Sequence, residues 1–280
     1  MTDLTIKSAF TMNDGNLIPL LGFGVFMIKD PATCEAAVTQ ALKAGYRHID
    51  TAHVYGNEES VGNAVAKSGL AREDIFITTK TVMEHNGQRI REVLSESLVK
   101  LQSDYVDLLL IHWPLNDEGI SGAWETLQRL KEEGLCRSVG VSNFTVRRFE
   151  EVLLRDSPPL PAVNQIELHV YNQRPELVNY CREKGIALEA YSPLTRGKRL
   201  ADPGKILSDI AEEHGKTVPQ VMIRFLLEQD IVTLVKSGTL SRIRENADVY
   251  DFELTEKQMT ALKGLDEGLI VQDWFPKGYY

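Results

Sequence analysis

The sequence predicts a (β/α)8 barrel, or TIM barrel, in which eight parallel strands close into a ring with helices outside. Two observations indicate this fold class. Short apolar runs recur about every 30 residues with helical patterns between them, and polar residues collect where many of the runs end. The eight runs cover residues 21–26, 48–50, 76–80, 106–112, 138–142, 162–167, 187–192 and 232–237. Eight successive βα units favour a closed barrel.

An open, doubly wound sheet is the alternative architecture for the same alternation. Its usual fingerprint, GxGxxG after the first strand, does not follow the run at 21–26. No low-complexity segment, proline-rich linker or charge run marks a second domain. We therefore expect residues 1–280 to form one barrel domain.

The elements can be assigned in order along the chain. Residues 5–20 have two short strand-like stretches around Asn13-Asp14-Gly15, a hairpin expected to cap the barrel bottom. Asp30 and Pro31 then supply a cap and a first-turn proline for a helix that Gly45 closes. Further helical patterns cover 59–69, 88–102, 124–134, 175–185 and 219–229. Residues 192–205 form the longest irregular connection and are the candidate for a mobile active-site loop.

Composition excludes several function classes. A formal net charge of −9 disfavours general nucleic-acid binding, so any anion site must be local. No apolar run approaches the length of a membrane span, and residues 1–10 lack the features of a secretory signal. We expect a cytoplasmic protein. Cys34, Cys136 and Cys181 have spacings that fit neither a disulfide framework nor a zinc site, so we expect reduced, structural cysteines.

The strand ends carry residue types that together can build a proton donor. Asp50, Lys80 and His112 end three of the runs, and Tyr55 follows the first of these closely. A free phenol titrates near 10, and a nearby ammonium is expected to lower that pKa. Lys80 can supply the ammonium, Asp50 can keep it charged, and His112 can orient a substrate oxygen. Taken singly, Asp50, Lys80 and Tyr55 would more often be structural residues and His112 could equally be a core histidine, so the hypothesis depends on the four together.

Six motifs carry a resemblance to a known family. They cover residues 45–62 (GYRHIDTAHVYGNEESVG), 76–80, 111–114 (IHWP), 139–144 (VGVSNF), 162–167 and 234–249 (LVKSGTLSRIRENADV). In this order, over nearly the whole chain, they resemble the aldo-keto reductases. The resemblance implies hydride transfer from NADPH to a carbonyl carbon, with Tyr55 as general acid and Asp50, Lys80 and His112 as its supporting residues. No metal is implied, and a monomer is expected.

The resemblance also implies binding residues. The nicotinamide is expected against Tyr191, with its carboxamide held by Ser142, Asn143 and Gln165. Lys236, Ser237 and Arg242 suit the 2′-phosphate of NADPH, because a guanidinium binds phosphate bidentately. The remaining expected cofactor contacts are Ser192, Leu194, Glu245 and Asn246. The expected substrate wall comprises Phe26, Val54, His112 and Trp113, with Trp274 or Phe275 as further candidates.

Two departures from the family pattern stand out. Val82 lies where an aromatic residue is frequent, which bears on substrate preference, and Val235 lies where a proline often precedes the lysine.

Two other functions stay open at this point. One is a cofactor-binding regulatory protein of the same fold without significant turnover. The other is a phosphate-handling isomerase or aldolase, which would form a Schiff base at Lys80.

Overall fold

Eight parallel strands close into a barrel in the computed structural model, which describes residues 4–81, 87–114, 117–155, 158–200 and 204–272. The strands are β3 (Leu21–Gly24), β4 (His48–Asp50), β5 (Phe76–Thr81), β6 (Val106–Ile111), β7 (Cys136–Ser142), β8 (Val163–Glu167), β9 (Ala187–Tyr191) and β10 (Val232–Val235). β10 pairs in parallel with both β9 and β3. This closure confirms the barrel and rules out the open sheet.

The strands are buried on both faces, as helices outside a parallel barrel require. Every residue of β5 and β6 is buried, including the polar Lys80 and Asp107. Polar side chains in such strands need internal partners, because the barrel interior is packed with side chains and offers little water. The barrel interior therefore combines an apolar core with a small number of paired polar groups.

The predicted hairpin is present and lies at the amino-terminal end of the barrel strands. It consists of β1 (Ala9–Thr11) and β2 (Leu17–Pro19), paired antiparallel. Asn16 Nδ2 donates to Ser138 Oγ at 3.0 Å, near the start of β7, and Asn13 Nδ2 donates to Pro161 O at 2.9 Å, just before β8. These bonds fasten the hairpin across the bottom, as expected.

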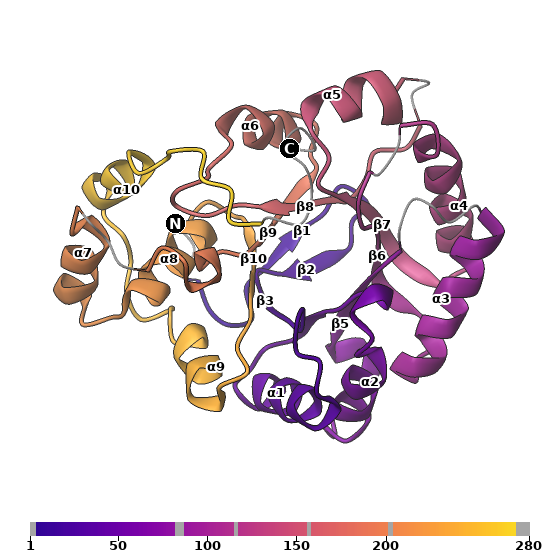
Figure 1. The fold of residues 1–280 in the computed structure, drawn as a ribbon, viewed down its shortest axis with the longest axis horizontal. Helices are drawn as coiled ribbons and strands as arrows, with labels where there is room; N and C mark the ends of the chain where they lie inside the picture. Colours follow the sequence, from indigo (N-terminus) through magenta and orange to yellow (C-terminus); the bar gives the residue numbers. More distant parts are fainter. Residues whose placement is uncertain (1–3, 82–86, 115–116, 156–157, 201–203, 273–280) are drawn as a thin grey trace.

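Helices surround the barrel strands on the outside (Figure 1). Their bounds are α1 (Pro31–Lys43), α2 (Glu58–Ala66), α3 (Gly87–Leu101), α4 (Ile120–Glu132), α5 (Val146–Arg148), α6 (Pro175–Glu183), α7 (Ile206–His214), α8 (Val218–Leu227), α9 (Leu240–Ala247) and α10 (Glu256–Lys263). The Asp30 side chain accepts a hydrogen bond from Thr33 N and caps α1, as predicted. Among the described residues, no helix is both long and apolar enough to cross a membrane.

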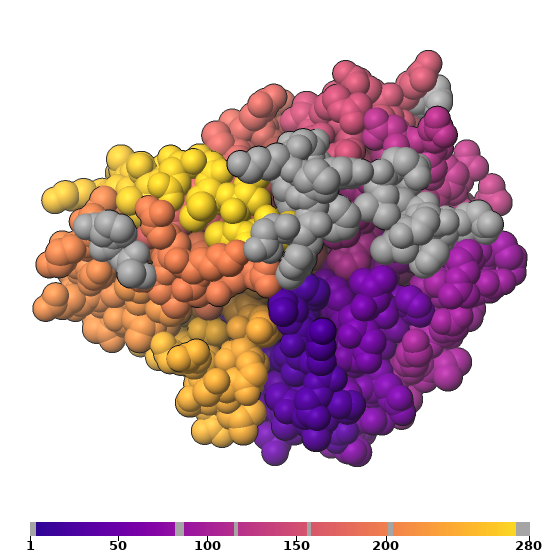
Figure 2. Space-filling model, in the orientation of Figure 1, coloured from indigo at the N-terminus to yellow at the C-terminus, as the bar shows by residue number. Residues whose placement is uncertain are grey.

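The first and last units of the chain lie side by side. Helix α1 packs against α9. In Figure 2 the indigo amino-terminal part of the chain lies directly beside the orange part from the last third of the sequence. Within the predicted loop at 192–205, a 3-10 turn, η4 (Thr195–Gly197), follows β9. Arg196 Nη2 in this turn donates to Met27 Sδ at 3.2 Å, linking it to the segment after β3. The start of the loop therefore lies at the carboxyl-terminal side of the barrel, and residues 201–203 of the predicted loop lie outside the described residues.

Candidate active site

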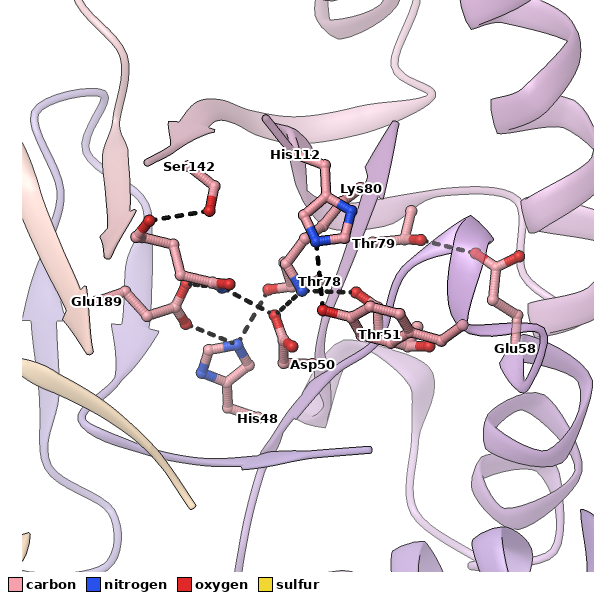
Figure 3. A network of polar contacts seen from close by, with 12 residues as sticks. His48, Asp50, Thr51, Glu58, Thr78, Thr79, Lys80, His112, Ser142 and Glu189 are labelled. Atoms are coloured by element: carbon pink, nitrogen blue, oxygen red, sulfur yellow. Dashed lines mark hydrogen bonds and ion pairs between the residues drawn. The ribbon is translucent and has the colours of Figure 1, made fainter. Parts of the chain in front are cut away.

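A buried ion pair lies at the carboxyl ends of β4 and β5. Lys80 Nζ donates to Asp50 Oδ2 at 2.6 Å and to Thr51 O at 2.8 Å (Figure 3). The side chains of Lys80 and Asp50 are 0% and 5% exposed. Charges removed from water in this way are stable only when paired and hydrogen-bonded, and both conditions are met here.

Tyr55 reaches the same place from the turn that follows β4. It ends the 3-10 turn η1 (His53–Tyr55), and Gly56 then takes a left-handed conformation at φ 69°. The Tyr55 hydroxyl lies 3.4 Å from His112 Nε2, and Lys80 Nζ lies 5.1 Å from the centroid of the Tyr55 ring. The structure thus brings the four predicted residues together. Their catalytic roles stay a prediction.

The electrostatics differ from the expectation for the phenol. Burial raises the pKa of Tyr55 well above 10, and the carboxylates of Asp50 and Glu189 raise it further. The Lys80 ammonium, 5.1 Å from the centroid of the Tyr55 ring, does not outweigh this effect of burial. Burial, and then Lys80, hold the pKa of His112 well below its usual range. At neutral pH the site therefore presents a neutral phenol beside a neutral imidazole, both able to act as hydrogen-bond donors.

The residues expected around the nicotinamide form a connected polar group. Ser142 Oγ donates to Gln165 O at 2.9 Å, and Asn143 Nδ2 donates to Ser142 Oγ at 2.9 Å and to His112 O at 3.2 Å. Tyr191 OH donates to Asn143 Oδ1 at 2.8 Å. Asn143 has a left-handed backbone at φ 65°, which asparagine tolerates better than most residues. The ends of β7, β8 and β9 thus meet beside His112.

Gln165 connects this group to the ion pair. Its Nε2 donates to Asp50 Oδ2 at 2.9 Å and to Glu189 Oε2 at 2.7 Å. Both amide hydrogens are engaged in this way, so a ligand amide can approach Gln165 only as a donor to its carbonyl oxygen. This restricts how the glutamine can hold a carboxamide.

A second buried polar pair, Glu189 and His48, was not predicted from the sequence. Glu189 Oε1 lies 3.4 Å from His48 Nε2, which in turn lies 3.0 Å from Thr78 Oγ1. Burial and the nearby Asp50 raise the pKa of Glu189 to about 8. Burial, and then Lys80, lower the pKa of His48 to about 3. The available signal was a glutamate in the middle of the apolar run at 187–192, where a strand buried on both faces leaves no route to solvent.

The expected phosphate site lies further out, after β10. Lys236 and Arg242 are exposed, whereas Ser237 and Asn246 are buried. Partial loss of hydration, and then the nearby Arg196, lower the pKa of Lys236. Arg196 was not predicted, and it places a further cation close to Lys236.

The other expected contacts on this side have internal partners of their own. Glu245 Oε1 accepts a hydrogen bond from Thr217 Oγ1 at 2.8 Å. Ser192 O accepts from Thr195 N at 2.9 Å, and Leu194 packs partly buried against the core. The loop from Ser192 to Arg196 thereby has a defined conformation near Lys236.

The expected substrate wall is partly assembled. The Phe26 ring packs 4.8 Å from that of Tyr55, and Trp113 is buried directly after His112. Val54 is 55% exposed, next to Tyr55 in the chain. Trp274, Phe275 and Val82 lie outside the described residues, and Val235 is buried at the end of β10. Phe26 therefore places an apolar ring against the Tyr55 phenol.

The polar groups lie at the carboxyl-terminal ends of the barrel strands, where enzymes of this fold have their active sites, and comparison with known proteins shows the family. The family model described as Aldo/keto reductase family matches residues 20–267, so the chain belongs to this family. Glyoxal reductase of Bacillus subtilis is 42% identical over 264 residues, covering 94% of each chain. Methylglyoxal reductase DkgA of Yersinia pestis is 42% identical over 269 residues, covering 95% of each.

The fold comparison includes a structure with a cofactor. A Bombyx mori aldo-keto reductase solved in complex with NADP has a TM-score of 0.88 and 34% identity, covering 97% of this chain and 96% of that one. The similarity spans the whole barrel. The resemblance seen in the sequence motifs is therefore confirmed.

Proposed function

We propose that the protein reduces aldehydes, ketones or dicarbonyls to alcohols with NADPH, using Tyr55 as the proton donor. The observation that carries this proposal is the pair of neutral donors, Tyr55 OH and His112 Nε2, 3.4 Å apart beside the buried Lys80–Asp50 pair. Two relatives are named for glyoxal and methylglyoxal reduction, so small dicarbonyls are the first substrates to try.

A carbonyl oxygen placed between Tyr55 and His112 would accept two hydrogen bonds. His112 donates in the tautomer that carries its proton on Nε2, and the low pKa of the ring keeps it neutral. When bound, the nicotinamide supplies a hydride to the carbonyl carbon. Each donor aimed at the developing oxyanion contributes about 3–4 kcal/mol in comparable enzymes.

Tyr55 then gives its proton to the oxygen, and a phenolate remains. A phenol with so high a pKa is a weak acid, so the phenolate needs a nearby positive charge. The Lys80 ammonium lies 5.1 Å from the centroid of the Tyr55 ring and can supply this charge. Asp50 keeps Lys80 in place and charged through the 2.6 Å ion pair. The ion pair thus serves proton transfer without touching the substrate.

The cofactor fits the polar groups already described. Ser142, Asn143 and Gln165 would hold the carboxamide, and the ring would stack on Tyr191. Lys236, Ser237 and Arg242 would hold the 2′-phosphate, with Glu245 and Asn246 near the adenine. The NADP complex of the Bombyx mori relative supports this choice of cofactor.

The test is the rate of NADPH oxidation with a panel of aldehydes, ketones and dicarbonyls, for the native protein and for Tyr55→Phe. We expect turnover with NADPH, weaker turnover with NADH, and a loss of about 10²–10⁴-fold in kcat for Tyr55→Phe. Tyr105→Phe makes the same change at the other end of the barrel, just before β6, and should leave the rate unaltered.

Two outcomes would favour the other functions. If both proteins bind NADPH and neither turns over, the chain is a cofactor-binding regulatory protein. The aldolase alternative requires a nucleophilic Lys80, yet this amine donates to Asp50 and Thr51 O and is fully buried. We therefore expect no adduct at Lys80 after borohydride treatment with substrate, as read by mass spectrometry.

A further inference from the structure

We propose that Glu189 is a positioning residue that holds Gln165 and carries a proton during carbonyl reduction, so that Asp50 and Lys80 stay a balanced pair beside Tyr55. Neither the four predicted catalytic residues nor the expected cofactor contacts include this glutamate. It lies on β9, inside the barrel, and is 0% exposed. The kinetic part of this proposal rests on the proposed reductase function.

The geometry places two carboxylates around one amide nitrogen. Gln165 Nε2 donates to Glu189 Oε2 at 2.7 Å and to Asp50 Oδ2 at 2.9 Å. The glutamine cannot rotate without breaking both hydrogen bonds. Glu189 and Asp50 together therefore fix the orientation of a side chain that is expected to meet the nicotinamide carboxamide.

The charge count indicates where a proton is held. The charged groups facing Glu189 are Asp50 and Lys80, and His48 is kept neutral by its low pKa. With both carboxylates ionised, this buried cluster would carry one net negative charge, which the interior disfavours. Asp50 has the ammonium of Lys80 at 2.6 Å, so the proton belongs on Glu189.

The second oxygen of Glu189 offers a place for this proton. Oε1 is buried and has no hydrogen-bond partner among the described residues, and His48 Nε2 lies 3.4 Å from it (Figure 3). A neutral imidazole nitrogen accepts a hydrogen bond when its own proton is on the other nitrogen. A protonated Glu189 therefore has an acceptor within reach, and the raised pKa of about 8 agrees with this state at neutral pH.

Loss of this proton has a defined effect on Tyr55. A negative charge on Glu189 raises the pKa of the Tyr55 phenol, in addition to the larger effects of burial and of Asp50, because like charges in a buried site repel. Raising that pKa disfavours the phenolate that reduction leaves behind. Hydride transfer should therefore slow as pH rises through about 8.

The experiment compares Glu189→Gln with the native protein by single-turnover stopped-flow, following NADPH absorbance from about pH 6 to about pH 9.5, a range that spans the titration of a group near 8. The glutamine can keep its carbonyl oxygen on Gln165 and has no titrating proton. We expect the two proteins to have matching rates near neutral pH. At alkaline pH, Glu189→Gln should react about three- to tenfold faster than the native protein, which corresponds to a shift of about 0.5–1 unit in the pKa of a neighbouring group.

Two further variants separate this role from a structural one. Glu189→Asp keeps a titrating carboxyl and should retain the alkaline decline. Asp107→Asn removes another buried carboxylate, near the start of β6 and paired with Arg72, and should lower stability while retaining the decline. A Glu189→Gln profile that follows the native one at every pH would overturn the proposal.

Infrared difference spectroscopy tests the proton without any turnover. We expect a carboxylic-acid carbonyl band in the native protein at neutral pH, absent in Glu189→Gln and titrating away near pH 8. Absence of this band in the native protein would refute a proton on Glu189, even in an active reductase. If the band is present but the native protein has no activity, the reductase function fails and the protonation result stands.

Discussion

At the scale of single residues, the Lys80–Asp50 pair has the largest energetic consequence. Both charges are removed from water, so each depends on the other, Lys80 on its bond to Thr51 O and Asp50 on the bond that it accepts from Gln165 Nε2. Removing one partner of a buried pair leaves the other charge uncompensated, which typically costs about 3–5 kcal/mol, whereas removing both can cost little.

Asp50→Asn should therefore lower the free energy of unfolding by about 3–5 kcal/mol and reduce kcat strongly, because Lys80 loses its anion. The double variant Asp50→Asn with Lys80→Met should recover much of the stability and none of the activity. Urea denaturation and steady-state kinetics on the three proteins measure both effects. A single variant as stable as the native protein would show that the pair is not the main stabiliser of the buried ammonium.

Sequence reasoning found Asp50, Tyr55, Lys80 and His112 because each lies at or just after a recognisable strand end. It missed Glu189, whose position in mid-strand gives no sign that its side chain will meet Gln165. It was also wrong about the direction of the Tyr55 pKa shift. That shift depends on burial and on which part of the phenol faces Lys80, and neither can be derived from spacing in the sequence.

At the scale of elements, the packing of α2 against α3 depends on one glycine. A Cβ at Gly62 would clash with the backbone of Lys100 and Leu101 at the end of α3. Backbone atoms cannot yield as a flexible side chain can, so the two helices would have to separate. Because α2 follows the turn that carries Tyr55, its position also affects the active site.

Gly62→Ala should destabilise the protein by about 1–3 kcal/mol through this overpacking. Gly122→Ala is the matched control, because Gly122 lies exposed in α4 and a methyl group there would meet no atom outside its own helix within 4 Å. That change should stabilise by about 0.5–1 kcal/mol, the helix propensity of alanine over glycine. Chemical denaturation of both variants gives the comparison, and equal effects of the same sign would contradict it.

Element boundaries were harder to predict than element types. The helix predicted from Trp124 begins at Ile120 in the structure, because Gly119 and the residues after it give no strong start signal.

The loop after β9 contacts the carboxyl-terminal segment through two interactions. Arg199 pairs with Glu267 at 3.1 Å, and Lys198 Nζ donates to Val271 O at 2.9 Å. These interactions join residues about 70 positions apart, and local sequence patterns cannot predict contacts at that separation.

At the scale of the whole molecule, closure of the barrel creates the site. The described polar groups come from the ends of six successive strands, β4 to β9, and Asp50 meets Gln165 across 115 residues of chain. Eight repeated units made closure predictable from the sequence. The cross-barrel neighbours were not predictable, since they depend on the tilt and stagger of the strands.

Because the expected cofactor contacts lie on separate units of this barrel, NADPH should stabilise the whole fold. A ligand at about 100 times its Kd adds about 2.7 kcal/mol to the free energy of unfolding. For a chain of this size, we expect a rise in Tm of at least about 5 °C. NADH should give a smaller rise, since it lacks the phosphate that Lys236 and Arg242 are expected to bind.

Arg242→Ala should remove most of the difference between the two cofactors in a thermal-shift titration. Arg244→Ala is the matched control on the same helix, because Arg244 Nη2 donates to Gln40 Oε1 at 3.3 Å and no phosphate contact is expected from it. If Arg242→Ala retains the full preference for NADPH, the 2′-phosphate is held elsewhere. Arg196, whose charge already lowers the pKa of Lys236, would then be the next residue to change.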